Sequence, residues 1–417
     1  MSIAGRVRDE AAATPERAAS VRHILLAALV VGLAVSITLS ESSLIALALW
    51  LLIARPSRPR PAWPLLGPLA AFAAWTIVAA LASAAPLDSL AAAKSLLVLA
   101  AFWVVLNVLP DARAARVFLV ALFAAVSVVA VLAIVQVAVC PPAELAPARS
   151  TPVLGRFLSK CGRAHGFYSI YMTLAGVLAV VLASVLPRLL LRPRDAWWAA
   201  TAWLAGAVAL ALTFVRGAWI ALTVGALGAL LALRRVRAAL ALVAVLVALA
   251  LVVPGVRDRL RSLGTVHDDT TRDRLAMLDA GLRLVRDHPL TGVGPGQVKK
   301  VYPAVAGPEA LRRSTSHLHD TPLQIAVERG LPGLAAWLTV FVAFFARALA
   351  ILRALPPERG DDRALVAGCI AAVATFLVGG LFEHNFGDTE VLLVALALMA
   401  LPFVVERDVI AARERPA

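Results

Sequence analysis

Charged residues are scarce in this chain: they make up 16% of its 417 residues, whereas hydrophobic residues make up 61%. This composition excludes an ordinary soluble domain. The glycine-rich stretch 288–297 lacks the Gly-Lys-Ser/Thr of a phosphate loop, and no compact Asp/Glu metal motif is evident. The net charge of +14 carries no nucleic-acid signature. We therefore expect no cofactor, no metal ion and no nucleic-acid partner.

Apolar sequence is abundant instead. Runs of about 20 residues, long enough to cross a bilayer, recur from His23 onward. They predict an all-α polytopic membrane bundle of about 12 transmembrane helices in contact with membrane lipids. The expected spans are 24–40, 42–54, 64–84, 91–109, 114–139, 166–186, 196–214, 217–233, 237–254, 331–353, 363–382 and 388–404.

Basic residues indicate how the bundle is oriented. If the N-terminus is cytoplasmic, every segment on the inside carries Arg or Lys, as the positive-inside rule requires. The polar N-terminal segment is followed by a span without a small-residue cleavage site, so it reads as a tail and not as a signal peptide. The expected organisation is a cytoplasmic tail 1–22, transmembrane helices one to nine in 23–254, a periplasmic catalytic loop 255–330, transmembrane helices ten to twelve in 331–404, and a cytoplasmic tail 405–417.

The loop 255–330 is far longer than the median connection of about 4 to 6 residues, and such loops are usually functional. Within it, Leu275, Leu278, Leu282 and Val285 recur at helical spacing. This spacing predicts an amphipathic helix that rests on the bundle through these side chains.

A second helix start in this loop places a histidine at the membrane surface. Asp320 or Thr321 can cap the helix, with Pro322 in its first turn, so His319 lies just outside a helix N-terminus. The helix dipole disfavours a protonated ring there, which leaves a neutral imidazole able to accept a proton. A purely capping or packing histidine is the alternative, and for His288 we favour a role in shaping a turn.

Several further polar residues gather on the outside of the predicted bundle. Arg216 stands between two apolar runs without a local acidic partner, so its guanidinium is available for a phosphate; simple snorkelling is the alternative. Polar clusters in the outside turns suggest a lined cavity, although they could merely hold helix ends together. The candidate substrate-binding residues are Arg163, His165, Tyr168, His317, Glu383, His384 and Asp388.

Three cysteines occur in the chain. Cys140 and Cys161 flank one outside loop, whereas Cys369 lies within a span. A disulfide between the first two would close this loop in an oxidising compartment, and two unpaired thiols are the alternative.

Ordered motifs between about residues 160 and 405 resemble those of bacterial O-antigen ligases, within the O-antigen ligase and polymerase superfamily. They are GFYSIYMTLAG, RGAWIAL, RLAML followed by DHPLTGVGPG, HLHDTPLQIAVERGLPGL and EHNFGDTEV. The resemblance implies that Arg216, Arg274 and His319 are catalytic. Asp320 stands where many members have Asn, and Leu278 stands where Trp is common.

The resemblance also implies an inner-membrane glycosyltransferase of bacteria with its active site facing the periplasm. Such a ligase moves O-antigen from undecaprenyl pyrophosphate to a sugar hydroxyl of lipid A-core, a step of lipopolysaccharide biosynthesis. Arginines can neutralise the leaving pyrophosphate without a metal ion, while a histidine removes the acceptor proton in a single inverting displacement. An O-antigen polymerase and a protein O-oligosaccharyltransferase share the donor chemistry and are the alternatives, followed by a transporter.

Overall fold

The computed structural model describes residues 3–54, 62–141, 157–158, 161–191, 197–237, 239–240, 244 and 269–413. Within these ranges every regular element is helical and no strand occurs, so the all-α prediction is confirmed. The elements are α1 (Ile3–Val35), α2 (Ile37–Ala54), α3 (Leu66–Leu81), α4 (Pro86–Ala92), the 3₁₀ helix η1 (Ala93–Leu99), α5 (Ala100–Val108), α6 (Ala112–Ala138), α8 (Tyr171–Leu191), α9 (Trp197–Leu212), α10 (Arg216–Ala232), α13 (Asp269–Asp287), α14 (Val298–Val305), α15 (Thr321–Ala354), α16 (Gly360–Gly379) and α17 (Thr389–Arg413).

Seven stretches in the described part of the chain are long and apolar enough to cross a membrane. They lie in α1, the continuous α4–η1–α5 stretch, α6, α8, α15, α16 and α17, and shorter apolar helices are α2, α3, α9 and α10. Together they cover every expected span except the ninth, 237–254, which lies almost wholly outside the described residues. The chain is thus a helical membrane protein, and the total of about 12 spans stays a prediction.

Two expected spans differ in detail from the structure. The N-terminal tail is continuous with the first span, because α1 already starts at Ile3. The fourth expected span is built from α4, η1 and α5, so a 3₁₀ segment interrupts the α-helix within it.

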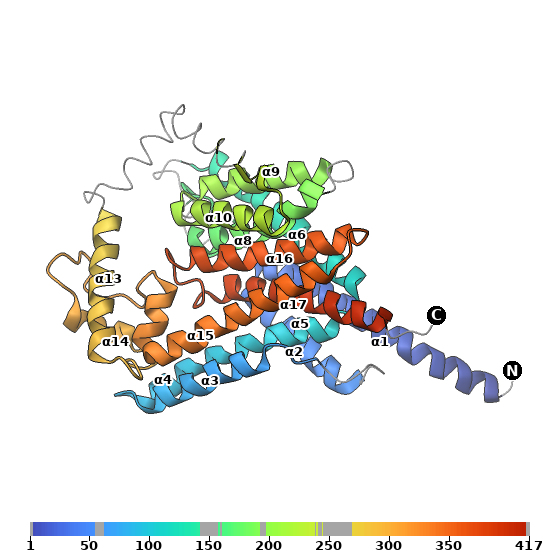
Figure 1. Cartoon of the computed structure of the whole chain (residues 1–417), viewed down its shortest axis with the longest axis horizontal. Coiled ribbons are helices and arrows are strands. Elements are labelled where there is room, and N and C mark those ends of the chain that lie inside the picture. The colour runs from blue at the N-terminus through green and yellow to red at the C-terminus, as the bar shows by residue number, and fades with distance from the viewer. Residues whose placement is uncertain are drawn as a thin grey trace.

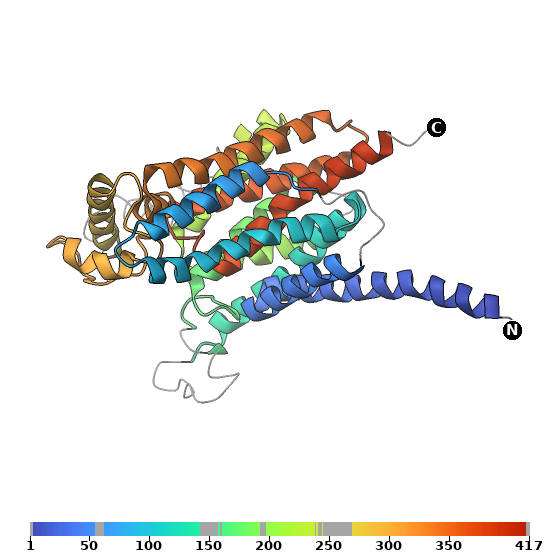
Figure 2. The same cartoon turned by 90° about the horizontal axis from the view of Figure 1, so that it is seen from below.

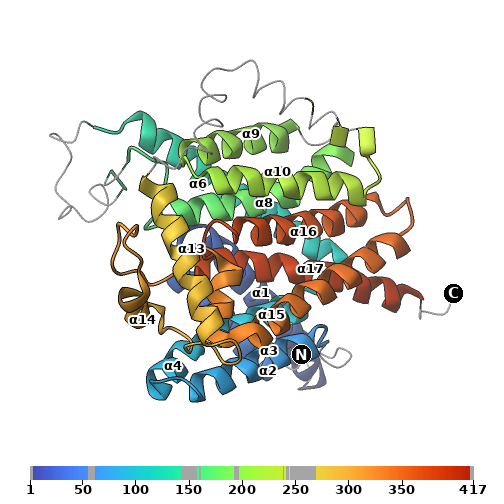
Figure 3. The same ribbon diagram turned by 60° about the vertical axis from the view of Figure 1, so that its left-hand side comes forward.

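The long helices run side by side along one axis of the molecule (Figure 2). Both chain ends lie at one end of this bundle, whereas α13 and α14 lie at the other (Figure 1). Figure 3 shows α13 lying across that end, in front of the tips of the bundle helices. Polar segments that are distant in sequence therefore meet at one end of the bundle.

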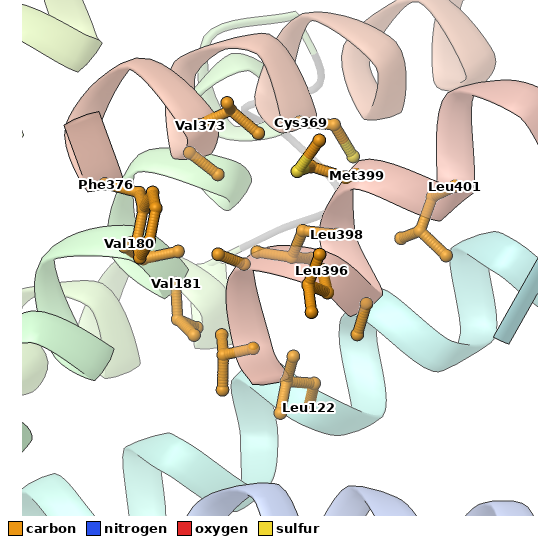
Figure 4. Close-up of a cluster of buried hydrophobic side chains, with 14 of the residues drawn as sticks. Leu122, Val180, Val181, Cys369, Val373, Phe376, Leu396, Leu398, Met399 and Leu401 are labelled. Carbon is orange, nitrogen blue, oxygen red and sulfur yellow. The ribbon is translucent and has the colours of Figure 1, made fainter. Parts of the chain in front are cut away.

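The centre of the bundle is formed by α16 and α17, of whose apolar windows 78% and 83% are buried. Figure 4 shows Cys369, Val373 and Met399 of these helices packed together with side chains of α6 and α8. Small residues allow close helix approach, since a Cβ on Gly368 would collide with the Ser184 carbonyl. This tight packing fixes the ends of α16 and α17, where the polar turn between them begins.

The helix α15 is kinked at Gly330, whose φ of 69° is left-handed. The glycine-rich stretch after α13 lies against the kink. There, Val293 N–H donates to the Val327 carbonyl (2.8 Å) and Leu331 N–H donates to the Pro289 carbonyl (2.8 Å). The turn of α15 around Gly330 is thus hydrogen-bonded to the glycine-rich stretch after α13. These bonds fix the first turns of α15 relative to α13.

The predicted amphipathic helix in the outside loop exists as α13, but the face expected to rest on the bundle is wrong. Of the four predicted side chains, Leu275, Leu278 and Leu282 are exposed and Val285 alone packs against the buried cluster, to which the helix contributes Met277, Ala280 and Leu284. The helix has two apolar stripes, and the one with small residues packs inward. A Cβ on Gly281 would come within 2.6 Å of the Leu323 side chain, so close approach to α15 selects this face.

Candidate active site

A cavity of about 600 Å³ opens where α13 crosses the end of the bundle. Its walls come from the start of α8, the α9–α10 turn, α13, the loop before α15 and the turn between α16 and α17. The charged and imidazole side chains that line it are Arg163, Arg216, Asp273, Arg274, Arg312, His319 and Glu383. Residues separated by more than 200 positions thus share one polar chamber at the boundary of the membrane bundle.

The residue at the centre of this chamber is Glu383, in the α16–α17 turn. Its Oε2 lies 2.7 Å from Nδ1 of His319, and its Oε1 accepts a hydrogen bond from Nη2 of Arg274. Both the His319 and Glu383 side chains are nearly buried, with 11% and 12% of their surface exposed. With Nδ1–H donating to the carboxylate, the other ring nitrogen, Nε2, is left as the proton acceptor.

The backbone around His319 is specified by its neighbours. His319 has a left-handed φ of 52°, which costs a non-glycine residue energy that the surroundings must offset. Asp320 caps α15 by accepting from Leu323 N–H (2.7 Å), and Thr321 N–H donates to the Gly380 carbonyl (2.6 Å). The Thr321 hydroxyl also donates to the Glu383 carbonyl (3.0 Å). These bonds join the start of α15 to the turn that carries Glu383.

Two arginines border the α9–α10 turn on another wall of the cavity. Arg216 is the first residue of α10, so its side chain and the N-terminal end of this helix lie beside the cavity. Arg163 donates through Nη2 to the Phe214 carbonyl (3.0 Å), and its guanidinium lies 3.9 Å from the Tyr171 ring centre. Within the described ranges neither arginine has an acidic partner, so this wall offers uncompensated positive charge.

A match to a known family bears on this site. Residues 199–338 match the family model described as O-antigen ligase. This segment of the chain is therefore similar to O-antigen ligases. No curated protein matches the chain. The resemblance drawn from the ordered motifs is therefore confirmed, and this family indicates ligase- or polymerase-type glycosyl transfer on lipid-linked glycans in general.

The O-antigen ligase match includes Arg216, Arg274 and His319, but Arg163 and Glu383 lie outside it. The structure brings all five to the same cavity. The Arg274–Glu383–His319 contact therefore joins the matched segment to the following turn, and the polar chamber is completed by residues that the family model does not cover.

Two further histidines lie next to His319. The His317 and His319 ring centres are 4.5 Å apart, and the His317 and His384 ring centres are 6.1 Å apart. Burial, together with the neighbouring imidazole of His319, lowers the pKa of His317. Burial also lowers the pKa of His384 to about 3, so this ring is neutral near neutral pH. Neither ring belongs to the cavity lining.

Three predicted site residues are instead placed in supporting contacts. His165 is buried, with Nδ1 facing the Tyr168 carbonyl (3.0 Å) and Nε2 facing the Gln136 amide (3.0 Å). The Tyr168 hydroxyl donates to the Leu33 carbonyl (3.2 Å), and Asp388 accepts from the Thr173 hydroxyl (2.6 Å). None of these three side chains belongs to the cavity lining, so the structure does not bring them to His319.

Cys140 and Cys161 are joined by a disulfide, whereas Cys369 is a free, buried thiol. The bridge ties the segment that carries Arg163 to the end of α6. The Ala164 N–H donates to the Leu212 carbonyl (3.0 Å), which attaches the same segment to the end of α9. Arg163 is therefore held from both sides beside the cavity.

Two lining residues, Asp273 and Arg312, were missed by the sequence analysis. Neither belongs to a recognised motif, and their contact spans 39 residues of chain. The available signal was that Asp273 directly precedes Arg274 on one helix. Among the described residues, no three His, Cys, Asp or Glu side chains form a group that could hold a metal ion.

Proposed function

We propose that this protein is an O-antigen ligase that transfers O-antigen from undecaprenyl pyrophosphate to a sugar hydroxyl of lipid A-core, at the periplasmic face of a bacterial inner membrane. The observation that carries the proposal is the pairing of His319 and Arg274 with one carboxylate, Glu383, in an arginine-lined cavity of a chain similar to O-antigen ligases. This combination supplies a proton acceptor and positive charge within one chamber.

The proton acceptor is His319. Its Nε2 takes the proton of the acceptor hydroxyl while the hydroxyl oxygen attacks the anomeric carbon of the lipid-linked glycan. Glu383 holds the ring by accepting from Nδ1–H (2.7 Å), and its charge stabilises the imidazolium that forms. The new bond forms on the face opposite the pyrophosphate, so the anomeric configuration is inverted.

The leaving group departs with the electron pair of the broken carbon–oxygen bond, and the arginines neutralise its charge. Arg216 and Arg163 are suited to the pyrophosphate because no acidic side chain competes for them within the described ranges. Arg274 forms an ion pair with Glu383. It therefore lies between the arginines proposed to bind the pyrophosphate and His319. In this scheme guanidinium groups supply the electrostatic stabilisation and no divalent ion is needed.

A periplasmic location of the cavity is supported by the charge distribution along the chain. The cavity lies at the end of the bundle opposite both termini (Figure 1). Each short connection at the terminal end carries arginine, as expected of a cytoplasmic face, and the arginines of the long loop 255–330 do not count in a rule that concerns short loops.

A polymerase or a protein O-oligosaccharyltransferase would use the same donor chemistry with a different acceptor. A transporter is less well supported, because its charged site is expected near the bilayer midplane between repeated halves. Here the polar residues gather at one end of the bundle.

The lipopolysaccharide ladder of a gene-deletion strain tests the proposal. Deletion should remove every O-antigen-capped form, including forms with a single repeat unit, and the intact gene should restore them. Retention of single-repeat forms would instead indicate a polymerase. An unchanged ladder would overturn both assignments.

A further inference from the structure

The loop before α15 brings a fourth arginine to the cavity, on the histidine side. Arg312 lines the same chamber as His319. Its anchor, Asp273, directly precedes Arg274 on α13, and Arg274 contacts the same carboxylate, Glu383, as His319 does. Arg163 and Arg216, in contrast, belong to the α9–α10 wall. The cavity therefore has positive charge at two separate places.

Arg312 is held in position by Asp273 of α13. One carboxylate oxygen of Asp273 accepts from the backbone N–H groups of Leu311 and Arg312, both at 3.0 Å. The other oxygen lies 3.3 Å from Nε of Arg312. Asp273 is nearly buried, with 9% of its side chain exposed, whereas 67% of the Arg312 side chain is exposed.

These contacts leave the outer part of the guanidinium free to bind. Nε is engaged by Asp273, and within the described part of the chain the two Nη groups of Arg312 form no hydrogen bond. The two Nη groups can therefore form parallel hydrogen bonds to a carboxylate or phosphate. An exposed arginine whose backbone and Nε share one buried anchor loses less conformational entropy on binding than an unrestrained arginine would.

The proposed reaction assigns this arginine to one substrate. In an inverting displacement the acceptor approaches from the side of the base, and the leaving pyrophosphate lies on the opposite face. We infer that Arg312, positioned by Asp273, forms an anion subsite for the acceptor, binding a phosphate or carboxylate group near the attacking hydroxyl. This inference rests on the proposed function, because the base side is defined by His319.

Steady-state transfer by purified full-length protein tests the subsite, with undecaprenyl-pyrophosphate-linked O-antigen as donor and lipid A-core as acceptor. Arg312→Gln should raise the acceptor KM about tenfold, as for loss of a charge-assisted hydrogen bond, and leave the donor KM unchanged. Arg312→Lys should recover part of the loss. Arg286→Gln is the matched control, since Arg286 is an exposed arginine of α13 outside the cavity lining.

Chemically altered acceptors identify the anion. If the group is a phosphate, dephosphorylated lipid A-core should bind wild-type protein as weakly as intact acceptor binds Arg312→Gln, and the substitution should have no further effect. If the group is a carboxylate, acceptor whose carboxyl groups have been reduced should instead show this raised KM with wild-type protein. An unchanged acceptor KM in Arg312→Gln, or an equal rise in the donor KM, would overturn the subsite but leave the proposed function intact. No transfer by wild-type protein would overturn both.

Discussion

His319 and Glu383 are the two residues on which the proposed chemistry depends. We expect His319→Ala to lower kcat by about 10² to 10⁴-fold, because general base catalysis contributes that much. Donor binding and membrane insertion should be retained. His317→Ala is the matched control and should cost far less, since the His317 ring lies outside the cavity lining. The rate of glycosyl transfer, measured with purified donor and acceptor, tests this prediction. A larger loss of kcat in His317→Ala than in His319→Ala would make His317 the general base.

Glu383 is expected to act as a positioning residue, through the His319 ring. Glu383→Gln keeps the size of the side chain but removes the charge that stabilises a protonated ring. We predict a fall in kcat of up to about 10⁴-fold, as is known for a carboxylate that orients a general-base histidine, and a changed pH profile of kcat. Glu383→Asp should recover part of the activity. A pH profile identical to that of wild type would show that Glu383 serves the fold alone.

At single positions, sequence reasoning could select residues of the cavity where a residue stands out from its neighbours. Arg216 interrupts two apolar runs, and His319 precedes a capped helix, so both could be selected from local sequence. Arg312 and Asp273 could not be selected, because their relation is made by a loop that folds back on α13. His165 and Tyr168 were selected for their polarity, but buried polar groups are usually paired with backbone, as both are here.

Among the elements, the kink of α15 should be the most sensitive to a single methyl group. In Gly330→Ala the alanine would have to adopt an unfavourable left-handed backbone conformation, and its Cβ would collide with the Leu290 carbonyl. We expect a loss of stability of about 1–3 kcal/mol together with reduced activity, because His319 directly precedes the first turns of α15, which the kink holds in place. Thermal unfolding in detergent measures the first effect.

The control for this substitution is Gly228→Ala in α10, where an added Cβ meets no atom within 4 Å. This change should be neutral or stabilise the helix by up to about 1 kcal/mol, because alanine has the higher helix propensity. Equal melting temperatures for the two variants would contradict the role assigned to the kink.

The segment that carries Arg163 should depend on its disulfide. We expect the Cys140→Ser/Cys161→Ser double variant to lose about 2–4 kcal/mol of stability. When wild-type protein is denatured without reductant and treated with a thiol-alkylating reagent, only one of its three cysteines, Cys369, should be modified. Mass spectrometry of non-reduced digests should detect the linked peptides. Alkylation at all three cysteines would contradict the bridge.

The sequence predicted where helices occur more reliably than it predicted which side of a helix is buried. Hydropathy located the bundle helices because apolar length is a property of each segment alone. Hydropathy could not predict which face of α13 is buried, because the helix has two apolar stripes. The buried stripe is the one on which Gly281 allows close contact with Leu323 of α15. The 3₁₀ character of η1 likewise has no local pattern in the sequence.

For the whole molecule, the positive-inside pattern makes a prediction about sidedness. Reporter fusions ending after Arg313 and after Glu358 should give opposite signals, periplasmic for the first and cytoplasmic for the second. Alkaline phosphatase and a fluorescent protein are suitable reporters, since each is active on one side only. Identical signals from both fusions would overturn the orientation and the proposed periplasmic reaction.

The interruption of α15 at Gly330 also bears on how the protein responds to its bilayer. A membrane helix adjusts its tilt when the hydrocarbon thickness changes, and a straight helix would transmit that tilt to its tip. Here the nine residues before the kink, 321–329, are bonded to the loop after α13 and to the α16–α17 turn. Changes in the tilt of the longer segment, 331–354, should therefore be absorbed at the kink. His319 would then keep its distance to Glu383 in membranes of different thickness.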